Sequence, residues 1–460
     1  FIILKQFRLF EKTNKMLKHP KGSKKLLNAW ALYDWANSVY PLVISTAIFP
    51  IFYGSVTDDY ITFQGIEFKN TALISYVTAF AFLILVNITP LLSGIADYTG
   101  RKKLFMRFFC YSGSAACIML YWFDIENLET SLMYYFIALI GFWASLVFYN
   151  SYLPEIAFKE QQDKISAKGY AMGYIGSVIL LLINILMVNM PDKFFINELN
   201  GDAQINAMKI SFIMVGVWWF LFSQYSFYYL PGKKYYDRTN DKGNEHFVGA
   251  NVFFSGYSKL KEVWHQFKKL DTIKTFLVSF FIYSIALQTV ILVATYFGEA
   301  EINWGGDDEK RLGLIVSILL IQLVAIIGSV LSARISNKIG NINTLIILNF
   351  AWAMLCIFGY FVESTTQFYI AAGFVGLVMG AIQSLSRSTY SKLLPKSNNN
   401  TSYFSFYDVT QKTSIVIGMT LFATVDQITG SMRNSILLFF IFFVLGALVL
   451  MKLNKKKTAV

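Results

Sequence analysis

The sequence predicts an all-α membrane protein in which twelve transmembrane helices form two pseudo-symmetric six-helix bundles. The first observation is composition, since 55% of the 460 residues are hydrophobic and only 15% are charged, against about 25% charged in soluble domains. The second is a series of twelve apolar runs, each near the ~20 residues that cross hydrocarbon as a helix. The third is an alternation of basic and acidic segments between these runs.

The apolar runs divide the chain into five parts. A basic tail (1–27) precedes the first six-helix bundle (28–230), a polar linker (231–270) separates it from the second bundle (271–453), and a short basic tail (454–460) follows. We expect the spans at 28–53, 71–96, 105–123, 131–153, 167–189, 208–230, 271–297, 311–335, 342–362, 366–390, 402–424 and 433–452.

Charge in the connections fixes the predicted orientation. Lysine and arginine gather in every second connection, as in 101–107, 159–168 and 233–274, whereas 124–129 and 307–309 are acidic. Positive residues stay on the cytoplasmic side, so both termini and the linker are predicted to be cytoplasmic. One missed span would invert every later connection, so the alternation supports twelve.

Further expectations concern the chain start and the compartment. The sequence begins at Phe1, and we expect Met16 to be the natural start, with Phe1–Lys15 upstream of it. The predicted location is the inner membrane of a bacterial cell, where the protein would work as a monomer.

Several classes of function lack their sequence features. The three cysteines (Cys110, Cys117, Cys356) lie in apolar runs, so no disulfide or metal framework is indicated. No histidine falls in a span, and no Gly-x-x-x-x-Gly-Lys-Ser/Thr loop indicates ATP hydrolysis. The net charge of +12 follows the membrane topology and does not indicate nucleic acid. We therefore expect no enzyme activity, no cofactor and no metal.

The linker contains a predicted amphipathic helix. Its apolar residues recur at helical spacing, and its lysines occupy the other face. The apolar set is Leu260, Val263, Trp264, Phe267 and Leu270, and the lysines are Lys259, Lys261, Lys268 and Lys269. Two interpretations stay open, a helix on the anionic inner leaflet and a solvated linker helix.

A tight basic loop follows the second span. Gly94 would let two helices approach closely, and Gly100 permits a sharp turn. Asp97 is expected to accept hydrogen bonds from the amino end of the next helix. Arg101 and Lys102 would hold the loop on the cytoplasmic side and complete a gating loop.

Polar residues in the first span form the first candidate binding group. Asp34, Asn37 and Ser38 are spaced i, i+3 and i+4, so they share one helical face. A charge this far into a span costs about 2.5–3.5 kcal/mol on insertion scales, so it should face a partner or a water-filled cavity. The alternative is that Asp34 lies near the edge and pairs with a loop cation.

The eleventh span carries the second group. Asp408 and Lys412 lie one turn apart, with Lys412 about 15 Å from the start of the span, near the middle of the bilayer. A structural ion pair between them is one interpretation. The other is a contact from Lys412 to Asp34 that joins the halves in one conformation and breaks as they rock.

Further candidates are single polar residues. Gln383 and Arg387 lie one turn apart in the tenth span. Two interpretations of Arg387 stay open, an anchor that reaches the membrane surface and a ligand of the substrate. Gln288 in the seventh span is either a site residue or a polar contact between helices, and Glu155 is expected to neutralise Lys159.

Several segments together resemble one branch of the major facilitator superfamily. They are Tyr33–Ser38, Tyr152–Ala157, Gly169–Tyr174, Gln383–Ser388 and Phe406–Val409 with Lys412. The set is similar to the autophagy-related-protein-22-like group, whose fungal members export amino acids from the vacuole. The resemblance runs from about residue 28 to 424 and implies a major facilitator fold. The loop Gly94–Lys103, with its degenerate echo Asn337–Gly340, resembles the signature loop of the superfamily as a whole.

What the resemblance implies about residues is specific. Asp34 and Lys412 match charged positions of the group, whereas Asp408 stands where asparagine is common. Gly169, Gly173 and Gly176 lack the proline that antiporters of the superfamily usually carry in this span, so proton exchange is not supported by that pattern.

We therefore expect a secondary transporter that moves a small zwitterion, such as a neutral amino acid, by alternating access. Asp34 and Lys412 would complement the two ends of the solute, and a proton carried by Asp34 would supply the energy. The expected partners are the solute, protons and the lipid bilayer. The alternative is a non-transporting sensor or a lipid-handling member of the same fold.

Overall fold

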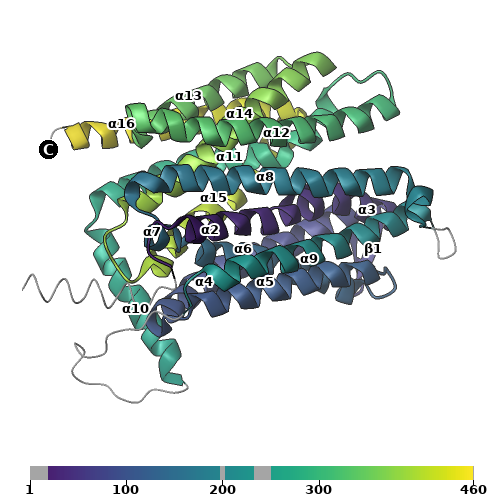
Figure 1. Cartoon of the computed structure of the whole chain (residues 1–460). Helices are drawn as coiled ribbons and strands as arrows, with labels where there is room; N and C mark the ends of the chain where they lie inside the picture. The colour runs from purple at the N-terminus through teal and green to yellow at the C-terminus, as the bar shows by residue number, and fades with distance from the viewer. Residues whose placement is uncertain (1–18, 197–201, 233–249, 459–460) are drawn as a thin grey trace, which may run out of the picture.

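The computed structural model describes residues 19–196, 202–232 and 250–458 (Figure 1). Most of the basic tail, the predicted start at Met16 and much of the linker lie outside the described residues. The first half contains α2 (Lys24–Asn37), the π-helix η1 (Tyr40–Ala47), α3 (Ile48–Val56), β1 (Tyr60–Phe63), β2 (Ile66–Lys69), α4 (Asn70–Thr99), α5 (Lys102–Met119), η2 (Leu120–Trp122), α6 (Leu128–Asn150), α7 (Leu153–Ile156), α8 (Lys159–Asn189), η3 (Pro191–Phe194) and α9 (Ala203–Tyr229).

Helix α10 (Ala250–Lys268) lies in the linker, and the second half contains α11 (Asp271–Glu301), α12 (Asp307–Ile339), α13 (Asn341–Tyr360), α14 (Thr365–Leu393), α15 (Asn400–Thr429) and α16 (Met432–Thr458). Within the described ranges, eleven helices are long and apolar enough to cross a membrane. Helix α15 matches them in length, but Asp408, Gln411 and Lys412 make it more polar. The predicted fold class is confirmed.

Two hydrophobic cores hold the two halves. One gathers buried side chains of α2 to α9, including Trp30, Phe52 and Trp219, and the other gathers those of α11 to α16, including Phe280 and Trp352. The halves meet where α15 packs on α4 and where α8 packs on α12 and α14. Figure 1 shows α8 running between α2 and α12.

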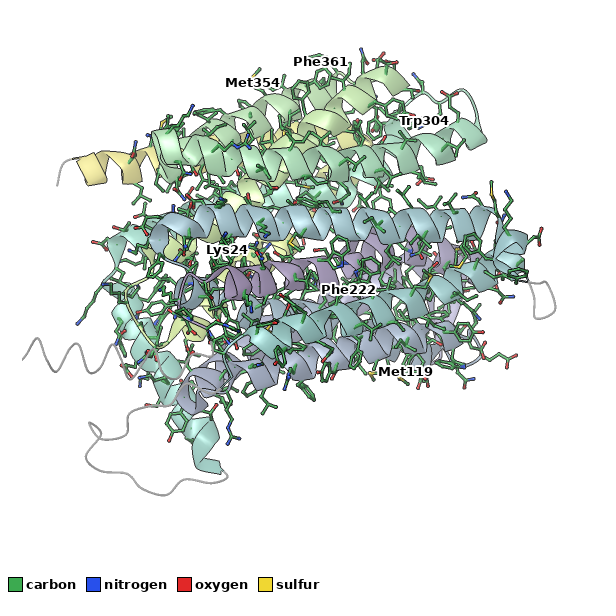
Figure 2. All side chains as sticks on the ribbon, in the orientation of Figure 1. Lys24, Met119, Phe222, Trp304, Met354 and Phe361 are labelled. Carbon is green, nitrogen blue, oxygen red and sulfur yellow. The ribbon has the colours of Figure 1, made fainter. Side chains whose placement is uncertain are left out.

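The outer surface of the bundle is apolar. Figure 2 shows Met119, Phe222, Met354 and Phe361 on the outside of the helices, and all four side chains are exposed. Large apolar surfaces of this kind require lipid contact, because water would not solvate them favourably.

The first span is interrupted near its middle. After α2 the chain forms the π-helix η1, in which Pro41 is one of the first residues, and then continues as α3. Proline lacks the N–H that an α-helix would use, so the regular hydrogen-bond ladder stops here. The Thr46 hydroxyl donates to the Pro41 carbonyl oxygen at 2.8 Å.

The two ends of the bundle differ in charge. The basic end carries the junctions α4–α5, α7–α8, α12–α13 and α14–α15, together with α10. The acidic end carries the hairpin β1–β2, whose turn uses Gln64 and Gly65 at φ 50° and 79°, as a two-residue hairpin requires. In Figure 1, α10 and β1 lie at opposite ends of the molecule.

The gating loop makes the predicted turn at Gly100, and the helix that approaches Gly94 closely is α10. Gly100 has φ 65°, and one residue, Arg101, separates it from α5. Gly94 does permit close approach, but to α10, since a Cβ atom there would lie 2.3 Å from the Gly256 carbonyl oxygen. The second junction also has a glycine with positive φ, Gly340 at φ 86°, but its ψ of 155° differs from the 20° of Gly100.

The linker helix forms as predicted, and its apolar stripe contacts protein. Val263 and Phe267 are buried, α10 packs on α4, and the rings of Trp264 and Phe267 contact Phe406 of α15. The apolar face of α10, which the sequence analysis considered for membrane contact, therefore packs largely against α4 and α15.

Candidate functional site

A buried ion pair joins the halves. Arg387 of α14 and Asp34 of α2 meet through the guanidinium NH2 nitrogen and Oδ2 at 3.0 Å, and the NH1 nitrogen lies 3.5 Å from Oδ1. The two residues are 3% and 5% exposed. The interpretation of Arg387 as a surface anchor is therefore wrong, because the first half of the molecule covers it.

The first half surrounds the guanidinium on several sides. Arg387 donates from Nε to the Ser166 hydroxyl at 3.0 Å, from NH2 to the Ser166 carbonyl at 2.9 Å and from NH1 to Asn150 at 3.4 Å. Three aromatic rings lie 4.2 to 5.6 Å from its central carbon, namely those of Trp30, Tyr149 and Tyr170. Such rings attract a cation, so the site favours positive charge opposite Asp34.

The glycine pattern at the start of α8 makes room for this pair. A Cβ atom on Gly169 would lie 2.3 Å from Asp34 Oδ2 and 3.0 Å from the Arg387 NH2 nitrogen. A Cβ atom on Gly173 would lie 2.4 Å from the Ser38 hydroxyl. Both glycines therefore allow α8 to pack closely on α2, and at Gly169 the neighbours are the paired charges themselves.

We expect Gly169→Ala to reduce transport more than about tenfold, because overpacking costs ~1–3 kcal/mol and displaces the pair. Uptake into vesicles containing the purified variant measures the effect. The matched control is Gly373→Ala on α14, where nothing lies within 4 Å of the added Cβ. Equal activity of both variants would show that the close approach at Gly169 is dispensable.

The other predicted residues of the first span and Gln383 lie beside the pair. Asn37 is buried, and its Oδ1 accepts a 3.5 Å hydrogen bond from the Ser38 hydroxyl. Gln383, one turn before Arg387, accepts a 2.8 Å hydrogen bond from the Tyr174 hydroxyl of α8. Gln288 is buried on α11, and within the described part of the chain no hydrogen bond joins it to these groups.

Of the two partners predicted for Lys412, the structure contains Asp408. Lys412 forms an ion pair with this residue on its own helix, so the predicted contact with Asp34 is absent from this structure, where Arg387 takes that place. Lys412 is wholly buried and still reaches the first half, since its Nζ lies 3.5 Å from the Trp143 carbonyl oxygen.

Asp97 of the gating loop connects the halves at the basic end. Its carboxylate accepts hydrogen bonds from the backbone of Thr401 at 3.2 Å and of Ser402 at 2.7 Å, and from the Ser402 hydroxyl at 2.7 Å. The predicted helix-end contact exists, but the helix is α15 and not α5. An anion is favoured there by the free amides of the first turn. We call this contact the Asp97 clamp.

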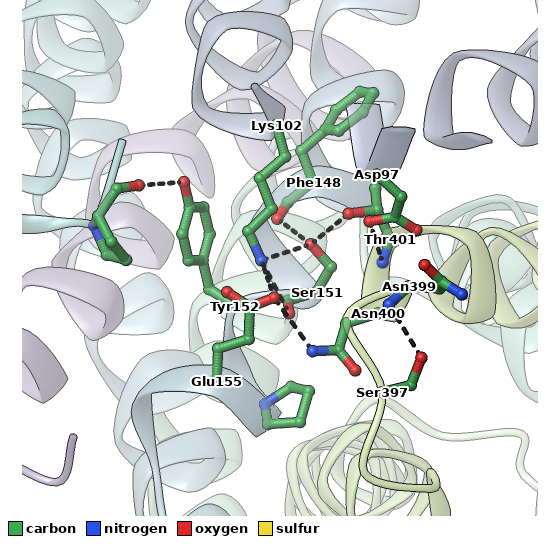
Figure 3. Close-up of polar contacts among 12 residues, drawn as sticks. Asp97, Lys102, Phe148, Ser151, Tyr152, Glu155, Ser397, Asn399, Asn400 and Thr401 are labelled. Carbon is green, nitrogen blue, oxygen red and sulfur yellow. Dashed lines mark hydrogen bonds and ion pairs between the residues drawn. The ribbon is translucent and has the colours of Figure 1, made fainter. Parts of the chain in front are cut away.

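The cations of the loop have separate roles. Lys102 forms a 2.9 Å ion pair with Glu155, which also accepts a 3.0 Å hydrogen bond from Asn400 (Figure 3). The ion-pair partner of Glu155 is therefore Lys102 and not the predicted Lys159. Arg101 is exposed at the start of α5.

A second clamp was missed in the sequence. Asp163 of α8 pairs with Lys392 of α14 and accepts hydrogen bonds from Asn341 at 2.8 Å and Ser336 at 3.2 Å. Lys392 also donates to the Asn341 side chain at 3.2 Å. We call this the Asp163 clamp. Both clamps and the Asp34–Arg387 pair lie toward the basic end, so the halves are held together there.

Comparisons with known proteins identify the family of this chain. Residues 22–460 match the family described as vacuole effluxer Atg22 like. An uncharacterised MFS-type transporter of Bacillus subtilis, YxiO, is 30% identical over 92% of this chain and 93% of its own. Autophagy-related protein 22 of Pichia angusta is 25% identical over 89% of this chain and 78% of its own.

Solved structures show the same fold at low identity. The transporter FucP in its outward conformation has a TM-score of 0.66 at 14% identity, covering 93% of this chain and 97% of FucP. An outward-facing bacterial homologue of the iron transporter ferroportin has a TM-score of 0.61 at 10% identity, with 94% and 98% covered. The chain belongs to the Atg22-like family and is a membrane transporter of the major facilitator type.

Proposed function

We propose that this transporter moves a small zwitterion, most simply a neutral amino acid, by alternating access around the Asp34–Arg387 pair. The observation that carries the proposal is the burial of two opposite charges between the halves. To separate the halves at the basic end, this pair must break. Removing one partner of a buried pair costs roughly 3–5 kcal/mol, because the other charge is left uncompensated.

A zwitterion can pair with both buried charges, Asp34 and Arg387, at once. Its carboxylate can pair with Arg387 and its ammonium with Asp34, so the site is neutral in this binding mode, in which Asp34 is ionised. The rings of Trp30, Tyr149 and Tyr170 add favourable surroundings for the ammonium. A simple anion or cation would leave one buried charge unpaired. The ligand thus favours the separated state because it replaces the contact that holds the halves together.

Proton coupling is the second part of the proposal. A proton on Asp34 would neutralise it and free Arg387 for the substrate carboxylate, while the substrate ammonium would face the rings. Lys412, paired with Asp408 and touching the first half at Trp143, remains a further candidate for the carboxylate. Coupling predicts that uptake depends on a pH gradient and carries net charge.

The substrate test uses one carbon skeleton with different charges. Leucine, the amine without its carboxylate and the acid without its amine are compared by thermal stabilisation of the purified protein, since a ligand of the folded state raises its stability. We expect leucine alone to stabilise and to be taken up by vesicles. Stabilisation by the acid or amine alone would overturn the zwitterion proposal, and binding without flux would favour a sensor.

We also propose that the basic end faces the cytoplasm. Cysteines at Ser55 and Gly305, at the acidic end, are expected to react with an impermeant thiol reagent in intact cells, and one at Lys261 of α10 is not. The three native cysteines are buried, so background labelling should be low. Labelling at Lys261 alone would reverse the orientation.

A further inference from the structure

Helix α10 has a second, unburied stripe. Phe254, Tyr257, Lys261, Trp264 and Lys268 follow the spacing i, i+3, i+7, i+10 and i+14, which places them on one face. The three aromatic side chains are 68%, 57% and 42% exposed, and both lysines are exposed. Trp264 is the least exposed of the three because one side of its ring contacts Phe406. The Lys268 ammonium lies 5.4 Å from the Trp264 ring centre. We call this face the aromatic–basic stripe.

The remaining sides of α10 are used differently. Gly256, Val263 and Phe267 are buried against the bundle. The only acidic side chain of α10, Glu262, pairs with Lys259 at 2.9 Å on the polar side. The aromatic–basic stripe therefore contains cations and rings and no acid.

The position of the helix indicates what covers this stripe. Figure 1 shows α10 lying across the ends of the long helices at the basic end, which is the level of a membrane surface for spans of this length. Aromatic rings are favoured at the headgroup level, and lysines there are attracted by anionic lipid. The chemistry of the stripe fits a negatively charged leaflet.

The same helix touches both parts of the Asp97 clamp. Gly256 packs on Gly94, three residues before Asp97. On the other side, Gln266 accepts a 3.1 Å hydrogen bond from the Tyr403 hydroxyl, one residue after Ser402, which donates to Asp97. Any force that fixes α10 at the membrane surface therefore acts on α4 and α15 together.

We propose that the aromatic–basic stripe of α10 docks on anionic lipid headgroups and that this docking stabilises the closed basic end through the Asp97 clamp. The inference goes beyond the proposed substrate and rests only on the transporter fold. It gives the membrane composition control over how readily the halves separate.

The docking test uses the purified full chain in lipid nanodiscs made of phosphatidylcholine or of its mixture with phosphatidylglycerol. An environment-sensitive fluorophore on Tyr257→Cys should shift to shorter wavelength in the anionic discs, and one on Lys269→Cys, on the polar side, should not. An equal shift in detergent with inorganic phosphate would overturn membrane docking, and so would equal spectra in the two lipids.

The closure test uses cysteines at Ser151 and Thr401, whose hydroxyl oxygens lie 3.4 Å apart across the halves. Anionic lipid should raise the rate of oxidative cross-linking by about fivefold or more, the factor for one lysine at an anionic surface. Lys261→Gln with Lys268→Gln should abolish the rise, and Lys269→Gln with Lys274→Gln, which remove the same charge off the stripe, should not. Equal effects of both double variants would overturn the role of the stripe. Neither measurement needs a substrate, so failure here is distinguishable from failure of the proposed function.

Discussion

Arg387→Gln is expected to abolish transport and to lower the free energy of unfolding by roughly 3–5 kcal/mol, because Asp34 would remain as a buried charge without its cation. Asp34→Asn should have a similar effect, since it leaves the guanidinium among three rings without its carboxylate. The double variant should recover most of the stability and none of the transport. Thermal unfolding and vesicle uptake measure the two quantities.

The control for these single and double variants of Asp34 and Arg387 is Lys274→Gln. Lys274 pairs with Asp271 at 2.7 Å, but both side chains are well exposed, and exposed pairs contribute about 0–1 kcal/mol. Additive losses in the double variant would mean that Asp34 and Arg387 are not coupled. Normal transport by the double variant would make the pair structural and remove the basis of the zwitterion proposal.

Asp163→Asn is expected to reduce transport by more than about tenfold, because Lys392 and Asn341 lose the carboxylate that joins them to α8 and breaking a buried pair costs several kcal/mol. Adding Asn341→Asp should restore much of the activity. The Asn341 and Asp163 side chains are 2.8 Å apart, and Lys392 contacts both. The double variant therefore moves the carboxylate from α8 to α13, and it stays beside Lys392.

This rescue distinguishes a clamp from a simple requirement for a folded basic end. The Ser151–Thr401 cross-link should form more slowly in Asp163→Asn and recover in the double variant. Asn341→Asp alone would place two acids beside one lysine, and it should not improve transport. If the double variant is no better than Asp163→Asn, position 163 itself and not the clamp is what transport needs.

Local chemistry in the sequence was enough to predict the fold and part of the site. Apolar runs and alternating charge predicted the two bundles, Gly100 predicted the turn, and the cost of burying Asp34 predicted a partner. In this structure the partner of Asp34 is Arg387 and not the predicted Lys412. Arg387 lies only six residues before the end of α14, and a cation there resembles a surface anchor until another half of the molecule covers it.

The Asp163 clamp shows the same limit. Asp163 lies among the lysines of 159–168, where sequence reasoning attributes charge to membrane topology. Its role depends on α12, α13 and α14, more than 170 residues away in the chain. The spacing of residues within one segment of the sequence does not indicate such a long-range contact. Asn341 at the second junction donates to Asp163, and this contact is visible only in three dimensions.

The π-helical interruption of the first span separates two mechanical tasks. Asp34 lies in α2, on the basic side of η1, whereas α3 leads to the acidic end. Because Pro41 supplies no N–H, the segment has less resistance to bending than an unbroken helix. The acidic end of this span is therefore able to tilt inward as a hinged arm while α2 keeps Asp34 against Arg387. We expect this bend to let the acidic end close over the site before the basic end opens, which would prevent a leak.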